Sequence, residues 1–304
     1  MPLLIRIAFA GVNFLGFISW VESLALVEEG EVIAIDGKTI RRSLDVASGT
    51  SPLHLVNAWA SEAGIALGQL ATEKKSNEIT AIPRLLQQLK VAGCIVTTDA
   101  MGCQKAVAAT IVEKGADYAL QLKRNHPLVW QEVHDYFDSE IGDTLQKSEA
   151  TFVETTDGGH GRIEVRRYWL TTDIGWFEDA HQWPGLKAFG MVESERTVAD
   201  GPTTSHRRYY LTSLDHVADF SRSVRSHWAI ENSLHWVLDM AFDEDQSRAR
   251  VGNAAENLAI LRQVALNLIK QEKVEKVGVK TKRKMCGWDH DYLLTVLQMR
   301  KSPY

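Results

Sequence analysis

The sequence predicts an α/β fold in which a mixed β-sheet carries helices on its faces and precedes a β-rich insertion. Three observations predict it. Apolar, branched runs alternate with amphipathic segments between residues 31 and 137, in the order βββαβαβα. Strand-like segments separated by glycine and proline then occupy residues 148–212. Helical periodicity returns from residue 213.

The predicted sheet begins with three successive strands, at residues 31–36, 53–61 and 65–72. Glu62, Ala63 and Gly64 form a tight link between the last two, which predicts a hairpin. The elements that follow are a helix at 76–91, a strand at 94–99, a helix at 102–114, a strand at 117–122 and a helix at 127–137. The strands at 31–36 and 94–99 each end on an aspartate, Asp36 and Asp99.

After residue 147 the sequence pattern becomes strand-like, and after residue 212 it becomes helical. The insertion contains four strand candidates, at residues 151–156, 163–171, 186–194 and 208–212. Helices are predicted over 220–245 and 254–270, where apolar residues recur at intervals of three and four. The chain ends with a basic run at 280–284, which we expect to be exposed, and a short amphipathic segment at 292–299.

Composition narrows the class of protein without naming a function. The chain has 304 residues, 45% of them hydrophobic, and a formal net charge of −5, which argues against a wholly basic DNA-coating protein but permits a local basic face. Three cysteines without close metal-ligand spacing predict reduced thiols in the cytoplasm. The apolar run at 7–21 is shorter than the roughly 20 residues that span a bilayer, so we expect a buried helix and no membrane association.

The predicted helix at 220–245 carries two faces. Ile230, Leu234 and Val237 form an apolar stripe, whereas His227, Glu231 and His235 align on another side. Two aspartates at strand ends and a glutamate on a later helix are the ligands that a two-metal phosphoryl-transfer site needs, because Mg²⁺ prefers carboxylate oxygens. The candidate catalytic and metal-binding residues are therefore Asp36, Asp99 and Glu231.

Each of these residues has a plainer interpretation. An aspartate at a strand end is often a turn former or a helix N-cap, and Glu231 is also placed to pair with Arg225 or His235 on a solvated helix face. His227 and His235, with Glu231 between them, are an alternative zinc site, although a third protein ligand is not evident. Trp228 and Trp236 fit either base stacking or, as the commoner role on an amphipathic helix, core packing.

Several longer motifs surround these residues. They are DGKTIRRS at 36–43, KSNEITAIPRLLQQL at 75–89, VTTDAMGCQ at 96–104, GHGRIEVR at 159–166 and HWAIENSLHWVLDMAFDED at 227–245. In this order they resemble the DDE transposases of bacterial insertion sequences, in particular the ISAs-type subgroup that includes the H-repeat proteins of Rhs elements. The resemblance extends from about residue 31 to residue 270. It implies a ribonuclease H-like catalytic core, with a β-rich insertion before the last catalytic helix.

The resemblance also implies roles for individual residues. Asp36 and Asp99 match the family's two aspartates, and Glu231 matches its glutamate. His227 stands where the wider class usually has arginine in the signature around that glutamate. The implied activity is metal-dependent DNA cleavage and strand transfer at the ends of an insertion sequence, with Mg²⁺ as cofactor and Mn²⁺ as its substitute.

The domain organisation follows from the same comparison. Residues 1–30 are expected to be the remnant of a helical associated domain, because related proteins carry a longer segment before the first aspartate. Residues 31–147 and 213–272 would form the catalytic core, 148–212 the insertion and 273–304 a tail. The protein is thus expected to be an N-terminally truncated transposase. The alternatives are a stand-alone metal-dependent nuclease, and a non-catalytic remnant that binds DNA or self-associates.

Basic residues and two histidines near the motifs are candidate DNA contacts. They are Lys38, Arg41, Lys75, Lys123, His160, Arg162 and His227. A solvated charge run or an ordinary hairpin turn is the alternative for most of them. The expected partners are transposon ends and target DNA, bound by a homodimer, in the cytoplasm of a bacterium and at the nucleoid when on DNA.

Overall fold

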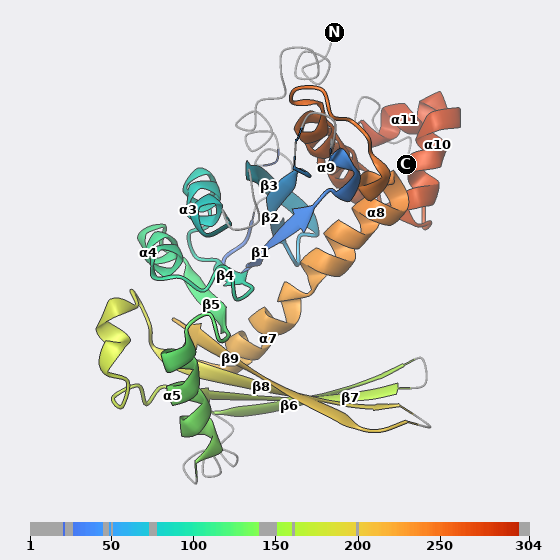
Figure 1. Cartoon of the computed structure of the whole chain (residues 1–304). Helices are drawn as coiled ribbons and strands as arrows, with labels where there is room; N and C mark the ends of the chain where they lie inside the picture. Colours follow the sequence, from blue (N-terminus) through green and yellow to red (C-terminus); the bar gives the residue numbers. More distant parts are fainter. Residues whose placement is uncertain are drawn as a thin grey trace. The chain divides into compact units, whose positions relative to one another are not determined.

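The computed structural model describes residues 21, 27–44, 49, 51–72, 78–139, 151–159, 162–198 and 201–297. The chain forms two compact units, one made of Met1–Leu89 with Trp228–Tyr304 and the other of Lys90–His227. Figure 1 labels the strands and α-helices of both. Among the described residues, no helix combines the length and the apolar character needed to cross a membrane.

The first unit contains an antiparallel three-stranded arrangement in the order β3-β2-β1. Its strands are β1 (Val32–Thr39), β2 (His54–Ala60) and β3 (Ile65–Thr72). Its helices are η1 (Arg41–Ser43), α3 (Glu78–Gln88), η4 (Ile230–His235), α8 (Trp236–Phe242), η5 (Glu244–Gln246), α9 (Ala254–Gln271), α10 (Val279–Trp288) and α11 (His290–Val296). The hairpin between β2 and β3 is confirmed, and β3 has its predicted bounds.

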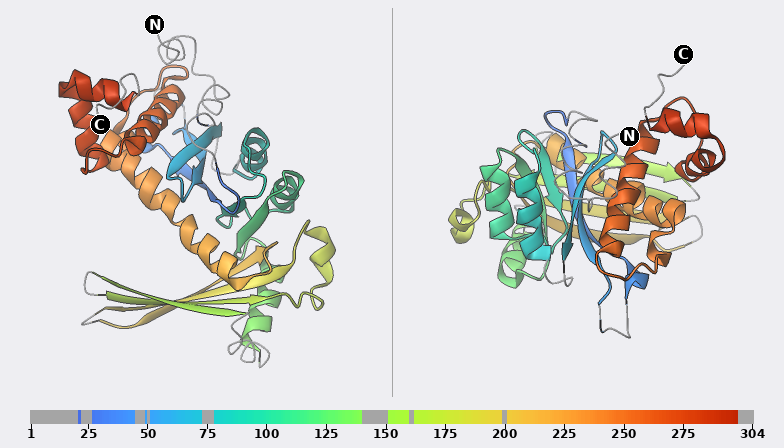
Figure 2. Two further views of the ribbon diagram at one scale, coloured as in Figure 1. Left: turned by 180° about the vertical axis from the view of Figure 1, so that it is seen from behind. Right: turned by 90° about the horizontal axis from the view of Figure 1, so that it is seen from above.

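The core of the first unit joins distant parts of the sequence. Ala34 and Trp59 of the sheet are buried in one cluster with Ile230 and Leu234 of η4 and with Leu266 of α9. The apolar stripe predicted on the helix at 220–245 therefore packs on β1 and β2. The basic run at 280–284 lies inside α10 and is only partly exposed, because Lys282 is buried. Figure 2 shows α10 and α11 side by side near the end of the chain.

The second unit contains a mixed sheet in the order β4-β5-β9-β8-β7-β6. Its strands are β4 (Ile95–Thr98), β5 (Asp117–Leu122), β6 (Phe152–Gly159), β7 (Arg162–Thr171), β8 (Ala188–Val198) and β9 (Thr204–Thr212). Its helices are α4 (Lys105–Glu113), α5 (Pro127–Asp138), η3 (Glu178–Gln182) and α7 (Val217–His227). β4 and β5 are parallel, whereas β9 joins β5 antiparallel, so the β-rich insertion extends the sheet of this unit.

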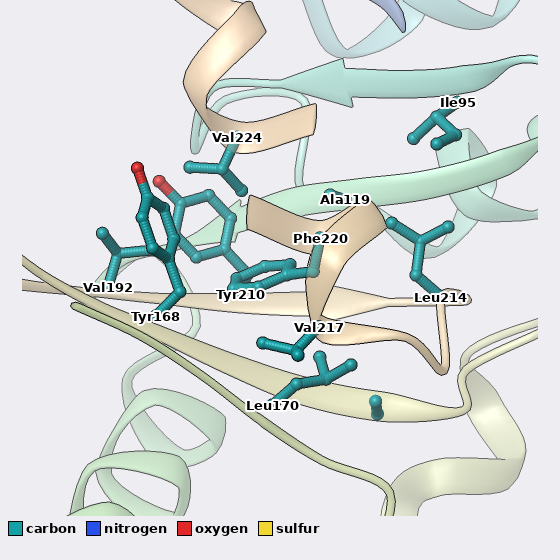
Figure 3. Packing of buried hydrophobic residues seen from close by; sticks show 11 residues of the cluster. Ile95, Ala119, Tyr168, Leu170, Val192, Tyr210, Leu214, Val217, Phe220 and Val224 are labelled. Carbon is teal, nitrogen blue, oxygen red and sulfur yellow. The ribbon is translucent and has the colours of Figure 1, made fainter. Parts of the chain in front are cut away.

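Strands β6 to β9 form a long antiparallel ribbon, which is visible in Figure 2. One end of the ribbon is buried beneath α7. Phe220 of α7 is fully buried among Tyr168, Leu170 and Tyr210, as Figure 3 shows. The element order and the mixed sheet confirm the predicted fold class, a ribonuclease H-like sheet flanked by helices with a β-rich insertion before the segment that carries Glu231.

Candidate active site

Asp36 lies inside β1 and not at its end. The ladder with β2 pairs Asp36 with Asn57 and continues to Thr39, so the prediction that the strand ends at Asp36 is wrong. The Asp36 side chain is 19% exposed, and its Oδ2 lies 3.5 Å from Nδ1 of His235 on η4. The first candidate carboxylate is thus partly accessible and is held within the β1–β2 ladder.

The glycine after Asp36 makes room for a buried polar pair. Nε2 of His54 and Oε1 of Glu78 are 2.5 Å apart, and Thr39 Oγ1 lies 2.7 Å from the other ring nitrogen of His54. A Cβ at position 37 would overlap the Glu78 carboxylate and lie 2.9 Å from His54 Nε2. Gly37 therefore lets β2 and α3 support β1 directly beside Asp36.

Lys38 is buried, with 8% of its side chain exposed. Its ammonium lies 2.6 Å from Asp239 of α8 and 2.9 Å from Glu244 of η5, and it donates to the carbonyl of His235 at 3.1 Å. Burial raises the pKa of Glu244 above its ordinary value, although Lys38 acts in the opposite direction. These contacts tie β1 to the end of the helical segment, and the DNA contact proposed for Lys38 stays a prediction.

Glu231 lies on η4, a segment with π-helical hydrogen bonding. The N–H of Trp236 donates to the carbonyl of Glu231 five residues earlier, which widens the helix at this point. Ile230 and Leu234 are fully buried, whereas Glu231 is exposed. The π turn thus anchors the segment on its apolar side and presents the Glu231 carboxylate to the surface.

The two tryptophans beside Glu231 are exposed, Trp228 at 42% and Trp236 at 61%. The interpretation that they belong to the core is therefore wrong for both. Bases of single-stranded nucleic acid stack on exposed aromatic side chains. Base stacking on Trp228 and Trp236 therefore stays a prediction.

Asp99 follows β4 directly in the second unit. Its Oδ1 accepts the backbone N–H of Met101 at 3.0 Å and that of Gly102 at 3.4 Å. The turn-forming role that was the plainer interpretation of this aspartate is therefore present, and it fixes the direction of the carboxylate. The half-buried side chain remains partly accessible to a ligand.

His227 is the last residue of α7, and its Nδ1 lies 2.9 Å from Oγ1 of Thr97 on β4. Desolvation lowers the pKa of this histidine from 6.5 to about 4. The ring is consequently neutral at physiological pH. It is attached to the strand that leads to Asp99, and the predicted contact of His227 with DNA stays a prediction.

The other predicted DNA contacts have varied settings. Arg41 is 83% exposed beside Asp245, and Lys123 and Arg162 are exposed after β5 and at the start of β7. Lys75 and His160 lie outside the described residues. The charges of the exposed side chains are accessible to solvent, and their contact with phosphate groups stays a prediction.

The three candidate carboxylates are divided between the units. Asp36 and Glu231 belong to the first and Asp99 to the second. Within the described part of either unit, no three His, Cys, Asp or Glu side chains form a cluster with metal-site geometry. The donor chemistry itself suits Mg²⁺, since all three candidates supply carboxylate oxygens from partly or fully accessible side chains.

Sequence reasoning missed the polar residues that support β1. Asn57 contacts His235, and Gln263 contacts Asn57. Lys38 contacts Asp239 and Glu244. The two partners of each contact are far apart in the sequence. The signal that was available is a polar residue inside a mostly apolar strand, at Asn57.

Comparison with known proteins finds one family model and several relatives that all concern transposases. The sequence matches the family described as the transposase DDE domain over residues 28–268. It is 40% identical to YncI of Escherichia coli O157:H7, which carries the provisional name of a transposase, over 92% of this chain and 72% of that protein. It is 35% identical to YhhI of Escherichia coli K12, an H repeat-associated protein with the same provisional name, over 92% of this chain and 75% of that protein.

A solved structure also resembles this chain. It is the piggyBac transposase in a synaptic complex with hairpin DNA, with a TM-score of 0.47 and 10% sequence identity. The match covers 91% of this chain and 55% of the piggyBac chain.

Proposed function

This chain belongs to the transposase DDE domain family, of the H-repeat type, and we propose that it cleaves DNA at element ends and joins the freed 3′ ends to target DNA. Asp36, Asp99 and Glu231 are the proposed catalytic carboxylates. The observation that carries this proposal is that the family match, from residue 28 to 268, contains all three together with the motifs around them.

Members of this family generally use divalent metal ions. We propose Mg²⁺ here, with Mn²⁺ as a substitute, held by Asp36, Asp99 and Glu231. The bound ions would activate the attacking oxygen and stabilise the leaving oxygen. The protein's own contribution is to hold the carboxylates, by the β1–β2 ladder at Asp36, by two backbone N–H groups at Asp99 and by the buried side of η4 at Glu231.

DNA binding follows from the family, and its details are proposals. The proposed contacts are Lys38, Arg41, Lys75, Lys123, His160, Arg162 and His227. Among those that the structure describes, Arg41, Lys123 and Arg162 are exposed. We propose a homodimer on DNA, because strand transfer brings two element ends together. The proposed location is the cytoplasm, at the nucleoid when DNA is bound.

The proposed domain organisation keeps the sequence-based boundaries. Residues 31–147 and 213–272 would form the catalytic core, 148–212 the insertion and 273–304 a tail. β9 supports an insertion that is continuous with the core sheet, because it pairs with β5 through Ala119–Thr212 and Leu122–Tyr209.

The test is a nicking assay on supercoiled DNA with Mg²⁺ or Mn²⁺. Asp36→Asn, Asp99→Asn and Glu231→Gln should each lower the rate by roughly a hundredfold or more, because each removes a charge from the metal site. Glu113→Gln, an exposed residue at the end of α4, is the matched control and should cleave like the wild type. Equal rates in all variants would exclude the proposed site.

The alternatives give different outcomes in the same assay. A non-catalytic remnant would bind DNA without cleaving it under any metal. A stand-alone nuclease would nick DNA but would not join a labelled element end to a target plasmid.

A further inference from the structure

His235, the last residue of η4, sits against the proposed catalytic carboxylate of β1. Its Nδ1 lies 3.5 Å from Asp36 Oδ2, and the two side chains are only 12% and 19% exposed. His235 therefore meets Asp36 in a partly desolvated setting, where an N–H directed at a carboxylate orients it more strongly than in water.

A series of side chains fixes the hydrogen on the His235 ring. Gln263 donates its amide N–H to Asn57 Oδ1 at 2.6 Å, and Asn57 Nδ2 lies 3.3 Å from His235 Nε2. The Asp36 carboxylate accepts and does not donate, so the ring hydrogen belongs on Nδ1. Nε2 is then the acceptor for Asn57. Gln263, Asn57, His235 and Asp36 thus form one chain in which each member donates to the next.

The backbone of His235 is held as firmly as its ring. Lys38 donates to the His235 carbonyl at 3.1 Å and pairs with Asp239 at 2.6 Å. Asp36 and Asn57 are directly opposite each other in the β1–β2 ladder, so their side chains leave the same face of the sheet. The ring contacts both, and its position is set from the sheet and from the helix.

We propose that His235 is a positioning residue for Asp36, which presents Nδ1–H to the carboxylate and fixes its orientation toward a divalent cation. This inference rests on the proposed function, because it gives Asp36 a ligand's role. Groups that hydrogen-bond to metal ligands restrict their orientation, and removing them typically costs about 10- to 100-fold in metal affinity or activity. Asn57 and Gln263 act in turn through His235.

The test separates the two ring nitrogens. In His235→Asn the amide nitrogen comes near the place of Nδ1, so the contact with Asp36 is kept. In His235→Gln the amide reaches the place of Nε2, so the contact with Asn57 is kept and the one with Asp36 is lost. Mn²⁺ affinity of the full chain, measured by electron paramagnetic resonance at constant pH, should fall about 10- to 100-fold in the glutamine variant and stay close to wild type in the asparagine variant.

Two further measurements make the outcome decisive. Asp36→Asn is the reference: if it weakens Mn²⁺ binding while His235→Gln does not, this inference alone is wrong, and if neither weakens it, the proposed function is wrong as well. The ¹⁵N shifts of the wild-type histidines, without metal, should show Nδ1–H on His235, identified by its absence from the glutamine variant. A hydrogen on Nε2 would overturn the inference even if the variants fold poorly.

Discussion

At the scale of single residues, Gly190 of β8 shows how closely α7 packs on the sheet of the second unit. A Cβ built at this position would overlap the ring of Phe220, which is fully buried. Gly190→Ala should therefore lower the free energy of unfolding by about 1–3 kcal/mol, because the ring has to shift in a filled core. Gly158→Ala on β6 is the control, because a Cβ added there would meet no neighbouring atom within 4 Å. If Gly190→Ala and the wild type unfolded at the same denaturant concentration, the close packing of Phe220 on position 190 would be wrong.

His227 provides a prediction about pH. Its pKa is about 4 in the folded chain because burial disfavours the charged ring, compared with an ordinary value of 6.5. In the unfolded chain His227 becomes protonated below about pH 6.5, whereas in the folded chain it becomes protonated only near pH 4. The stabilisation present above pH 6.5 is therefore lost as the pH falls through this window, by up to about 3 kcal/mol.

Removing this histidine should flatten the pH dependence. His227→Asn keeps a group that can bond to Thr97 Oγ1 but does not titrate. Its unfolding free energy, measured by urea denaturation from pH 4 to 7, should vary less than that of the wild type. The variant His206→Asn, at an exposed position of β9, should keep the wild-type slope. A wild-type slope in His227→Asn would show that another group is responsible.

At the scale of elements, Glu272 directly follows α9 and contacts side chains of α10 and α11. Its Oε2 lies 2.8 Å from Lys282 of α10 and 2.9 Å from the hydroxyl of Tyr292 on α11, and its Oε1 accepts from Glu275 at 3.0 Å. Glu272→Gln should leave the buried ammonium of Lys282 without its counter-charge, at a cost of about 3 kcal/mol or more. Hydrogen exchange should then increase across α10 and α11. Exposed Glu275→Gln is the control, and unchanged exchange would show that apolar packing alone holds them.

The elements differ in how far the sequence predicts them. Strands β3 and β5 have the bounds expected from their branched and apolar residues, most of which are buried. β1 is longer than expected. Its continuation through Gly37 and Lys38 depends on pairing with Val56 and Leu55, and the pairing partners of a strand are not encoded in the strand itself.

The sequence predicts the carboxylates of the candidate site but not the contacts that hold them. Asp36, Asp99 and Glu231 were predicted from the order of the motifs, and their role at a metal site stays a prediction. Lys38 is buried against Asp239 and Glu244, some 200 positions later, and the segment with the π turn at Glu231 packs on the sheet through Ile230 and Leu234. Such pairings become visible only when the chain is folded, since no local propensity specifies them.

At the scale of the whole molecule, a net charge of −5 has to be reconciled with binding to DNA. The two are compatible if a few accessible cations, such as Arg41, Lys123 and Arg162, supply local contacts to phosphates. Binding carried by such contacts releases counterions, so its affinity falls steeply as salt rises. The proposed cleavage would instead depend on the carboxylates and on a divalent ion. The two properties therefore reside in different groups and should separate in experiment.

Chelation of divalent ions should abolish DNA cleavage and leave DNA binding in place. Electrophoretic mobility shifts with labelled element ends, run with EDTA and with Mg²⁺, should give similar dissociation constants, while nicking occurs only with Mg²⁺. Replacing Arg41 and Lys123 by glutamine should weaken binding and reduce its salt dependence, because fewer counterions are released. The same change should leave the Mg²⁺ concentration for half-maximal nicking unaltered. If EDTA removes binding as completely as cleavage, the metal ions and not the exposed cations hold the DNA.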